Sequence, residues 1–241
     1  MIIGTAAAIA VVLVAALLFS VLYDAPSCMD RKQNQGEEGT DCGGPCSHLC
    51  SALVDAPRVS FARAFSTTSG RTDVISYVEN RNQEAEAKNA RYTVELFSAD
   101  GLQLAKREGM IDLPARSVVP VFVPGMYMGP IPVARAFVTF NESITWTPAK
   151  EGRTLLKVAD ALFTQGAEPR VTATLENPSA TAFYNVRVVV IAFDAEGSAL
   201  AASQTVVREV PAQGSAPAVF TWTAPFGDPI RIEVLPVLPL P

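Results

Sequence analysis

An uncharged, largely apolar stretch runs from Ile2 to Tyr23. At 1.5 Å per residue, a helix of this length spans about 30 Å, the thickness of the hydrocarbon core of a bilayer. Signal peptides usually have a shorter apolar region behind positive charges, and no Lys or Arg precedes this one. The pattern therefore predicts a retained transmembrane anchor. The alternatives are cleavage near Ala25 and Ser27, or lipid attachment at Cys28.

Beyond residue 50, apolar and polar residues alternate over short stretches, at 91–97, 171–175 and 185–193. Alternation with a period of two predicts β-strands that have one solvated face. Asp100-Gly101 and Glu196-Gly197 follow two of these stretches and predict hairpin turns, because Gly tolerates a positive φ. No helical pattern of convincing length follows residue 24, so the pattern predicts an all-β fold.

The same pattern of landmarks occurs twice in this region, in the same order. The first copy begins near Val59 and the second near Val158, a period of about 100 residues. Corresponding landmarks are Asn80 and Asn177, Gly101 and Gly197, and Leu113-Pro114 and Val210-Pro211. Shared order and spacing indicate duplication of a domain.

Each copy has the length and turn spacing of an Ig-like antiparallel β-sandwich with about seven strands. No Cys follows residue 50, which excludes an immunoglobulin domain built around a disulfide. We therefore predict an all-β protein of two tandem Ig-like antiparallel β-sandwiches, preceded by one N-terminal transmembrane helix and a small cysteine-rich neck. The predicted boundaries are 1–23 for the anchor, 24–52 for the neck, and 53–148 and 149–241 for the sandwiches. The joint at 145–152 is short, which predicts that the sandwiches stack end to end as a semi-rigid rod. The proline-punctuated end at 235–241 is expected to fray.

All four cysteines and the single histidine lie in the neck. A glycine-rich segment of this size cannot bury a core, so disulfides among Cys28, Cys42, Cys46 and Cys50 are the predicted source of its order. Four cysteines allow three pairings, and the sequence does not choose among them. A zinc site at Cys42, Cys46, Cys50 and His48 is the alternative, although the spacing lacks two separated ligand pairs. No C-x-x-C is present for a redox centre.

The neck also carries a run of side-chain oxygens of the kind that Ca²⁺ accepts. The candidate ligands are Asp30, Asn34, Glu37, Glu38 and Asp41. The run is not an EF-hand loop, since Lys32 occupies the third position and no helical pattern flanks it. A solvated acidic loop is the favoured interpretation, and a calcium site is the alternative.

Residues 28–46, CMDRKQNQGEEGTDCGGPC, resemble a motif of bacterial secreted and surface proteins, C-x-D-G-x-x-N-Q-G-E-x-G-x-D-C-G-G-P-C. Arg31 stands where the motif has its first Gly. The resemblance implies exposure outside the cell and no particular activity.

Both copies in the second part of the chain resemble FxLYD-type and late-embryogenesis-abundant-like β-sandwich domains. Phe97 and Phe193 match the end of the amphipathic strand in these domains. Asp194 matches the acidic residue that follows, whereas the first copy has Ser98 there. The resemblance implies binding or spacer modules of envelope proteins, with no catalytic residues.

Charge and motif content narrow the possible functions. The net charge is −5 and no basic run occurs, which disfavours a nucleic-acid partner. No phosphate-binding, nucleophile-elbow or metalloprotease motif is present, so we predict no catalysis. Aromatic platforms for carbohydrate would fall at Tyr127, Trp146 and Trp222, but strand contexts favour core packing for both tryptophans.

These features together predict a membrane-anchored, extracytoplasmic structural or protein-interaction component of a cell envelope. The chain would be a single-pass membrane protein held in the membrane by residues 2–23, with its C-terminal domains outside and other envelope or surface proteins as partners. Arg31 and Lys32 weakly favour the opposite orientation, but cysteine usage favours this one. No cofactor is predicted. The alternative is a ligand-binding or adhesive surface module that depends on Ca²⁺.

Overall fold

The computed structural model describes residues 12, 14, 17–18, 27–67, 70–141, 143–150 and 155–240. The chain divides into two compact units, and the division falls between Cys50 and Ser51. No helix within the described residues is long and apolar enough to cross a membrane. The predicted anchor at residues 2–23 lies almost wholly outside the described residues.

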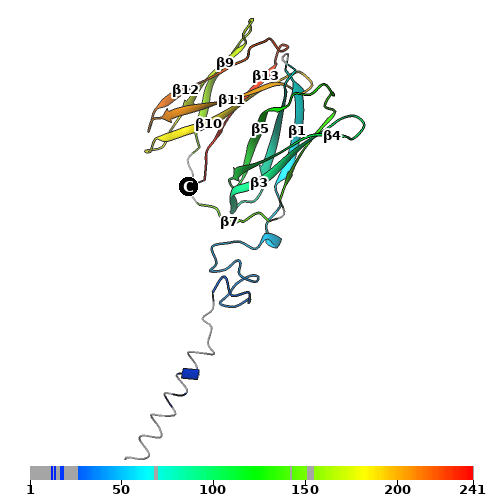
Figure 1. Cartoon of the computed structure of the whole chain (residues 1–241). Coiled ribbons are helices and arrows are strands. Elements are labelled where there is room, and N and C mark those ends of the chain that lie inside the picture. The colour runs from blue at the N-terminus through cyan, green and yellow to red at the C-terminus, as the bar shows by residue number, and fades with distance from the viewer. Residues whose placement is uncertain are drawn as a thin grey trace, which may run out of the picture. The chain divides into compact units, whose positions relative to one another are not determined.

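The first half of the Ser51–Pro241 unit forms two antiparallel sheets (Figure 1). One sheet has the strand order β1-β2-β5 and the other has the order β4-β3-β6, with β7 paired to the start of β3. A short 3-10 helix, η1 (Ser51–Leu53), precedes them. The strands are β1 (Arg58–Ser66), β2 (Thr72–Asn80), β3 (Ala85–Phe97), β4 (Gln103–Leu113), β5 (Ser117–Tyr127), β6 (Arg135–Phe140) and β7 (Thr147–Pro148).

The second half repeats this arrangement, with sheets in the orders β12-β9-β8 and β11-β10-β13. The strands are β8 (Lys157–Thr164), β9 (Arg170–Glu176), β10 (Phe183–Phe193), β11 (Ala199–Val210), β12 (Ser215–Thr221) and β13 (Arg231–Val237). Each strand from β1 to β6 corresponds to the strand seven places later, so the duplicated topology and the all-β fold are confirmed.

The expected number of about seven strands per copy is confirmed for the first half, which has β1 to β7, whereas the described residues of the second half form six strands. The two-residue β7 pairs with β3 and makes that sheet four-stranded, whereas both described sheets of the second half have three strands. After β13, the N–H of Leu240 donates to the side chain of Asp112 in β4.

The turns that join β3 to β4 and β10 to β11 are built alike, although their sequences differ. Gly101 N–H donates to Ser98 O and Gly197 N–H donates to Asp194 O, each across 3.2 Å. Both glycines have a positive φ, of 82° and 76°. Ser98 Oγ accepts the N–H of Leu102, just as Asp194 Oδ1 accepts that of Ser198. Ser98 therefore accepts the same turn hydrogen bond as Asp194, which occupies the corresponding position in the second copy.

One sheet of each half is buried on both faces, which indicates that the two halves cover each other. In β2, Val74 and Val78 face the other sheet of their own half, and Ile75 points the opposite way. Ile75 is nevertheless 0% exposed. In β10, Val188 and Val190 belong to the core of the second half, while Ile191 on the other face is also 0% exposed.

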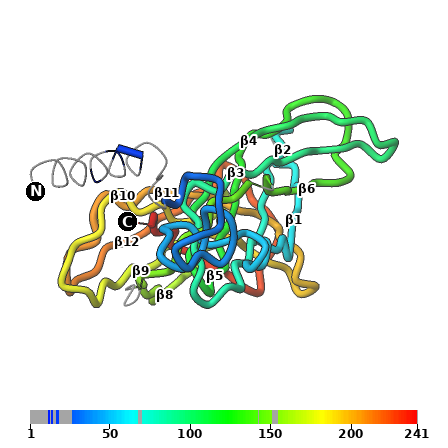
Figure 2. The backbone as a smooth tube through the Cα atoms, turned by 90° about the horizontal axis from the view of Figure 1, so that it is seen from below, coloured from blue at the N-terminus to red at the C-terminus, as the bar shows by residue number. Residues whose placement is uncertain are grey.

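Side-chain contacts identify what covers these outer faces. The rings of Phe61 in β1 and Phe193 in β10 lie 6.2 Å apart between centroids. Tyr77 in β2 donates a hydrogen bond to Glu233 in β13. The sheets β1-β2-β5 and β11-β10-β13 thus pack face to face, and the halves lie side by side (Figures 1 and 2). The predicted end-to-end rod is wrong, because both facing sheets offer apolar outer surfaces that end-to-end stacking would leave in water.

An ion pair borders this apolar contact and remains partly exposed. Arg231 pairs with Glu233, and its guanidinium carbon lies 4.0 Å from the centroid of the Phe193 ring. Burial raises the pKa of Tyr77 to about 12, although the charge of Arg231 acts in the opposite direction. The Tyr77 hydroxyl therefore remains protonated at physiological pH and remains the donor to Glu233.

The C-terminal residues extend the contact between the halves. Leu238 and Leu240 are buried, and Leu240 N–H donates to Asp112 Oδ2 in β4 across 2.7 Å. The expected fraying of this end is wrong for the described residues. Its apolar side chains gain burial against the fold, which offsets the entropy lost on ordering.

One buried asparagine in each half fixes the chain where the two sheets of that half meet. Asn80 Nδ2 lies 2.8, 3.1 and 2.9 Å from the carbonyl oxygens of Ala85, Leu113 and Pro114. In the second half, Asn177 Nδ2 makes the corresponding contacts of 2.8, 3.3 and 2.9 Å. Its acceptors are Thr181, Val210 and Pro211. Asn80 and Asn177, two of the repeated landmarks in the sequence, thus make the same set of hydrogen bonds in the two halves.

We expect Asn177→Ala to lower the free energy of unfolding by about 3 kcal/mol, because it leaves buried carbonyl oxygens without a donor. Chemical denaturation monitored by circular dichroism measures the loss. Gln103→Ala, which removes an exposed hydrogen bond to Glu95, is the control and should cost no more than about 0.5 kcal/mol. Equal losses for the two variants would contradict the role of Asn177.

Candidate functional site

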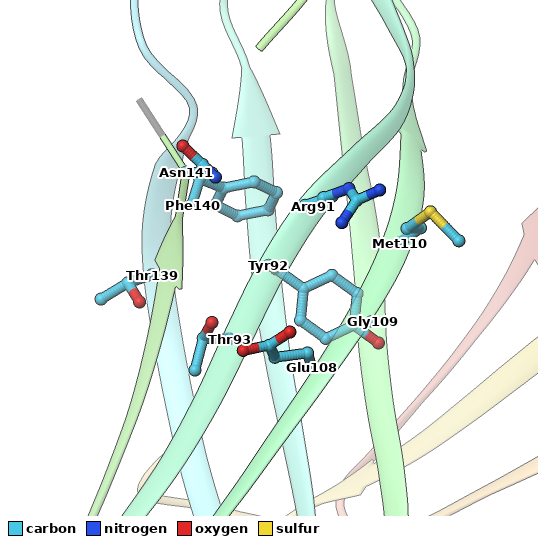
Figure 3. A pocket seen from close by; sticks show the side chains of 9 residues that line it. All are labelled: Arg91, Tyr92, Thr93, Glu108, Gly109, Met110, Thr139, Phe140 and Asn141. Carbon is cyan, nitrogen blue, oxygen red and sulfur yellow. The ribbon is translucent and has the colours of Figure 1, made fainter. Parts of the chain in front are cut away.

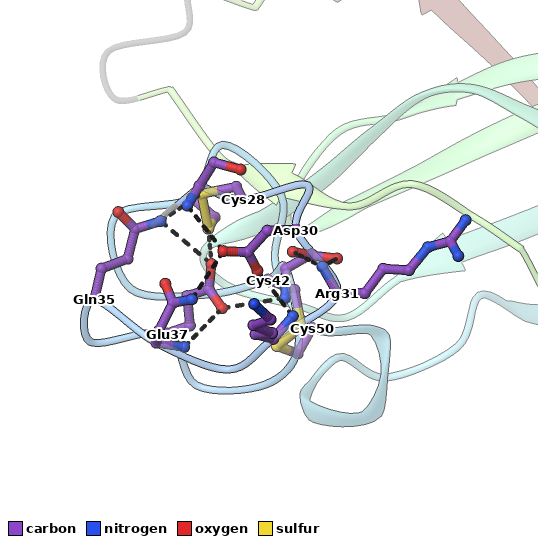
Figure 4. The surroundings of a disulfide bond; sticks show 12 residues. Cys28, Asp30, Arg31, Gln35, Glu37, Cys42 and Cys50 are labelled. Carbon is purple, nitrogen blue, oxygen red and sulfur yellow. Dashed lines mark hydrogen bonds between the residues drawn. A yellow bond between two sulfur atoms is a disulfide. The ribbon is translucent and has the colours of Figure 1, made fainter. Parts of the chain in front are cut away.

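The neck is held by two disulfides, Cys28–Cys46 and Cys42–Cys50 (Figure 4). No free cysteine occurs among the residues that the structure describes. The predicted disulfides are confirmed, and the structure chooses one of the three pairings. The alternative zinc site is wrong, because disulfide sulfurs are not thiolates, and the His48 side chain is exposed.

The carboxylate of Glu37 lies buried at the centre of the neck loops. Its Oε2 accepts the main-chain N–H of Asn34 at 3.3 Å and that of Asp41 at 3.2 Å. Its Oε1 lies 3.2 Å from the sulfur of Cys46, beside the Cys28–Cys46 disulfide. One side chain therefore ties both arms of the loop to a disulfide, which is a structural role in a segment with little apolar core.

Asp30 and Asp41 also accept main-chain hydrogen bonds. Both carboxylate oxygens of Asp41 accept the N–H of Arg31, at 3.1 and 3.0 Å. Asp30 accepts Asn34 Nδ2 at 2.9 Å and the N–H of Lys32 at 2.8 Å. The Asn34 hydrogen bond, followed by the backbone bonds, holds the pKa of Asp30 below its usual value.

The backbone of Arg31 explains the glycine of the motif. Arg31 has a φ of 62°, in the left-handed region that side chains with a Cβ seldom adopt. The motif's Gly would adopt it without that cost. In this chain the hydrogen bonds that the Arg31 N–H donates to both Asp41 carboxylate oxygens hold Arg31 in the same conformation.

The structure brings four of the five predicted calcium ligands together. Hydrogen bonds connect Asp30, Asn34, Glu37 and Asp41, whereas the Glu38 side chain is exposed and lies outside this network. Asn34 Oδ1 is buried and has no hydrogen-bond partner among the described residues. A further grouping is that of Cys28, Glu37 and Cys46, but two of its three members are disulfide sulfurs.

A hollow of about 520 Å³ lies on the β4-β3-β6 sheet (Figure 3). Gly109 lies opposite Tyr92 in the adjacent strand, and a Cβ at position 109 would come within 2.4 Å of the Tyr92 ring. The glycine thus makes room for the ring, whose burial raises the pKa of Tyr92. The hollow is lined by Arg91, Tyr92, Thr93, Glu108, Gly109, Met110, Thr139, Phe140 and Asn141, a set without Ser, Cys or His.

The three aromatic residues considered as carbohydrate platforms differ in their burial and in what they contact. Trp146 is 3% exposed and belongs to the core, as its strand context predicts. The Tyr127 hydroxyl accepts the N–H of Ile131, which fixes the loop after β5. Trp222 lies just beyond β12 and is only partly buried. It packs against the core of the second half, as its strand context predicts, and it also lines a second cavity.

Glu37→Gln should loosen the neck, because a neutral amide oxygen accepts the two main-chain N–H groups more weakly than a carboxylate does. We expect hydrogen exchange at the Asp41 amide to accelerate about 10- to 100-fold. Glu38→Gln changes the neighbouring, exposed carboxylate and is the matched control. The structural role of Glu37 would be contradicted if both variants exchanged at the wild-type rate.

No protein-family model and no curated protein matches this sequence. A solved structure with some similarity is red sea bream transglutaminase, at 13% sequence identity and a TM-score of 0.27. The match covers 76% of this chain and 29% of the transglutaminase chain, so this chain spans less than a third of that protein. A likeness of this degree carries no argument about function.

Proposed function

We propose that the chain is a membrane-anchored, extracytoplasmic structural or protein-interaction component of a cell envelope and that it performs no catalysis. Residues 2–23 act as the membrane anchor, and the neck and two tandem Ig-like sandwiches lie outside the cytoplasm. Other envelope or surface proteins are the partners.

The two disulfides of the neck are the observation that carries this proposal. Disulfides form and persist in oxidising compartments, whereas cytosolic thiols are kept reduced. Both bonds lie within Cys28–Cys50, directly after the apolar segment. A cross-linked segment in this position fits a spacer between a membrane and the domains that it presents.

The packing of the halves supports a structural role. The contact is made by buried apolar faces and by the Tyr77–Glu233 hydrogen bond, so the halves present their remaining surfaces in a fixed relation. Three cavities of the described Ser51–Pro241 unit have linings without His or Cys. A lining without these groups fits interaction better than nucleophilic or general-base chemistry.

Labelling with a membrane-impermeant maleimide in intact cells tests the location. We expect no labelling of the native chain, and labelling once an impermeant reductant has opened the disulfides. Cys46→Ser is the matched variant, because it frees Cys28 and should be labelled without reductant. Labelling of the native chain only after lysis, without reductant, would place the neck in the cytoplasm and contradict the proposal.

A second candidate function, a Ca²⁺-dependent ligand-binding or adhesive module, is favoured by Asn34 Oδ1 alone. This buried oxygen lacks a partner among the described residues and lies in a loop of carboxylates. However, oxygens of Asp30, Glu37 and Asp41 already accept main-chain N–H groups. These residues would hold the ion in the neck.

The calcium candidate predicts a higher melting temperature in Ca²⁺ than in chelator, because an ion that binds only the folded neck stabilises it. Asp30→Asn combined with Asp41→Asn should abolish the rise, and Glu38→Gln is the control. Identical melting curves in Ca²⁺ and chelator would reject this candidate and leave the first one standing.

A further inference from the structure

A cavity of about 490 Å³ lies where the two halves of the Ser51–Pro241 unit meet. The first half contributes residues from the ends of β1, β2 and β5. The second half contributes β11 and the segment after β12. Sites for small ligands have volumes of about 300–1,000 Å³ and often lie between domains. The cavity therefore has the size and position of a ligand site.

Four aromatic side chains from both halves line the cavity: Phe65, Phe122, Trp222 and Phe226. Trp222 and Phe226 meet edge to face, with ring centroids 4.9 Å apart. All four rings are only partly buried. Such rings offer apolar area to a ligand with little loss of conformational freedom, because each ring has few rotatable bonds.

The charges in the cavity cancel. Arg71 and Asp73 are the only charged residues of the lining. Arg71 Nε lies 2.9 Å from Asp73 Oδ1, and Arg71 Nη2 lies 2.9 Å from Asp73 Oδ2. The Asp73 side chain is 1% exposed and also accepts Gly125 N–H at 2.6 Å. Because the pair is bidentate and neutral overall, the cavity favours neither an anion nor a cation.

Hydroxyl and amide groups complete the lining, among them Ser203, Gln204 and Thr223. These groups can donate and accept hydrogen bonds. The edge of β11 is not open to an added peptide strand here, because Trp222 Nε1 donates to Ala202 O at 3.3 Å. An extended peptide would have to displace the indole to pair with this edge.

We propose that this cavity binds an uncharged saccharide. The apolar C–H face of a pyranose ring packs on Trp222 and Phe226, and its hydroxyl groups bond to the polar lining and to the outer N–H groups of Arg71. A neutral ligand with an apolar face and many hydroxyl groups matches every part of the lining. This site is independent of the calcium candidate, since its residues lie outside the neck.

Ligand-observed saturation-transfer NMR with a panel of neutral pentasaccharides (glucose, mannose, xylose, galactose and N-acetylglucosamine) tests the proposal. We expect saturable binding of at least one of them to the full chain. Phe226→Ala should weaken it about 10-fold or more, since it removes apolar contact area. Tyr184→Ala is the control, because this aromatic side chain is 63% exposed and does not line the cavity.

A measurement on the unmodified protein guards against misfolding of a variant. The bound saccharide should shift the indole N–H resonance of Trp222 and leave that of the buried Trp146 in place. Each saccharide is tested from 10-fold the protein concentration up to about 10 mM, well above the dissociation constants of ordinary ligands. The proposal is overturned if no member of the panel binds in this range. Tighter binding of a tetragalacturonate or of a proline-rich peptide would also overturn it, in favour of an anionic or a peptide ligand.

Discussion

The burial of one sheet face from each half against the other is the constraint on which the Ser51–Pro241 unit depends. A strand in a sheet that faces water on one side buries every second residue, whereas a strand in a sheet covered on both sides buries successive residues. β2 and β10 are covered on both sides, and Ile75 and Ile191 are the residues that show it. The relation of the halves, the docking of the C-terminal residues and the cavity lined by Trp222 all follow from this contact.

Much of the fold could be predicted from the sequence, because the signals are local. Alternation at 91–97 and 171–175 gave strands, glycine at 101 and 197 gave turns, and the paired landmarks gave the duplication. The relation between the copies could not be predicted in the same way. The contact depends on which outer faces are apolar, and the one signal was the continuous apolar run at 188–193.

In the neck, too, one part of the structure could be predicted from the sequence and another part could not. Cysteine content in a glycine-rich loop was sufficient to predict disulfides, but pairing depends on the path of the loop, which Glu37 fixes through two main-chain N–H groups. Glu37 was singled out as an oxygen ligand, whereas its contacts are those of a buried structural acceptor. The strand context of Trp222 predicts its contact with the core, but the cavity that it also lines depends on the relation between the halves and has no local signal.

The contact between the halves joins unlike faces of two like domains, so in principle it could be repeated. The first copy uses its β1-β2-β5 face and the second uses its β11-β10-β13 face, which leaves the complementary face of each copy unused. An arrangement of this type, if repeated, builds a ring when the rotation closes and an open filament when it does not. On the unused faces, Thr172 and Thr174 stand where the first copy has Ile75 and Tyr77, and Thr93 and Glu95 stand where the second has Val189 and Ile191. A further copy added through the same contact would bury these polar residues, which disfavours repetition of the contact.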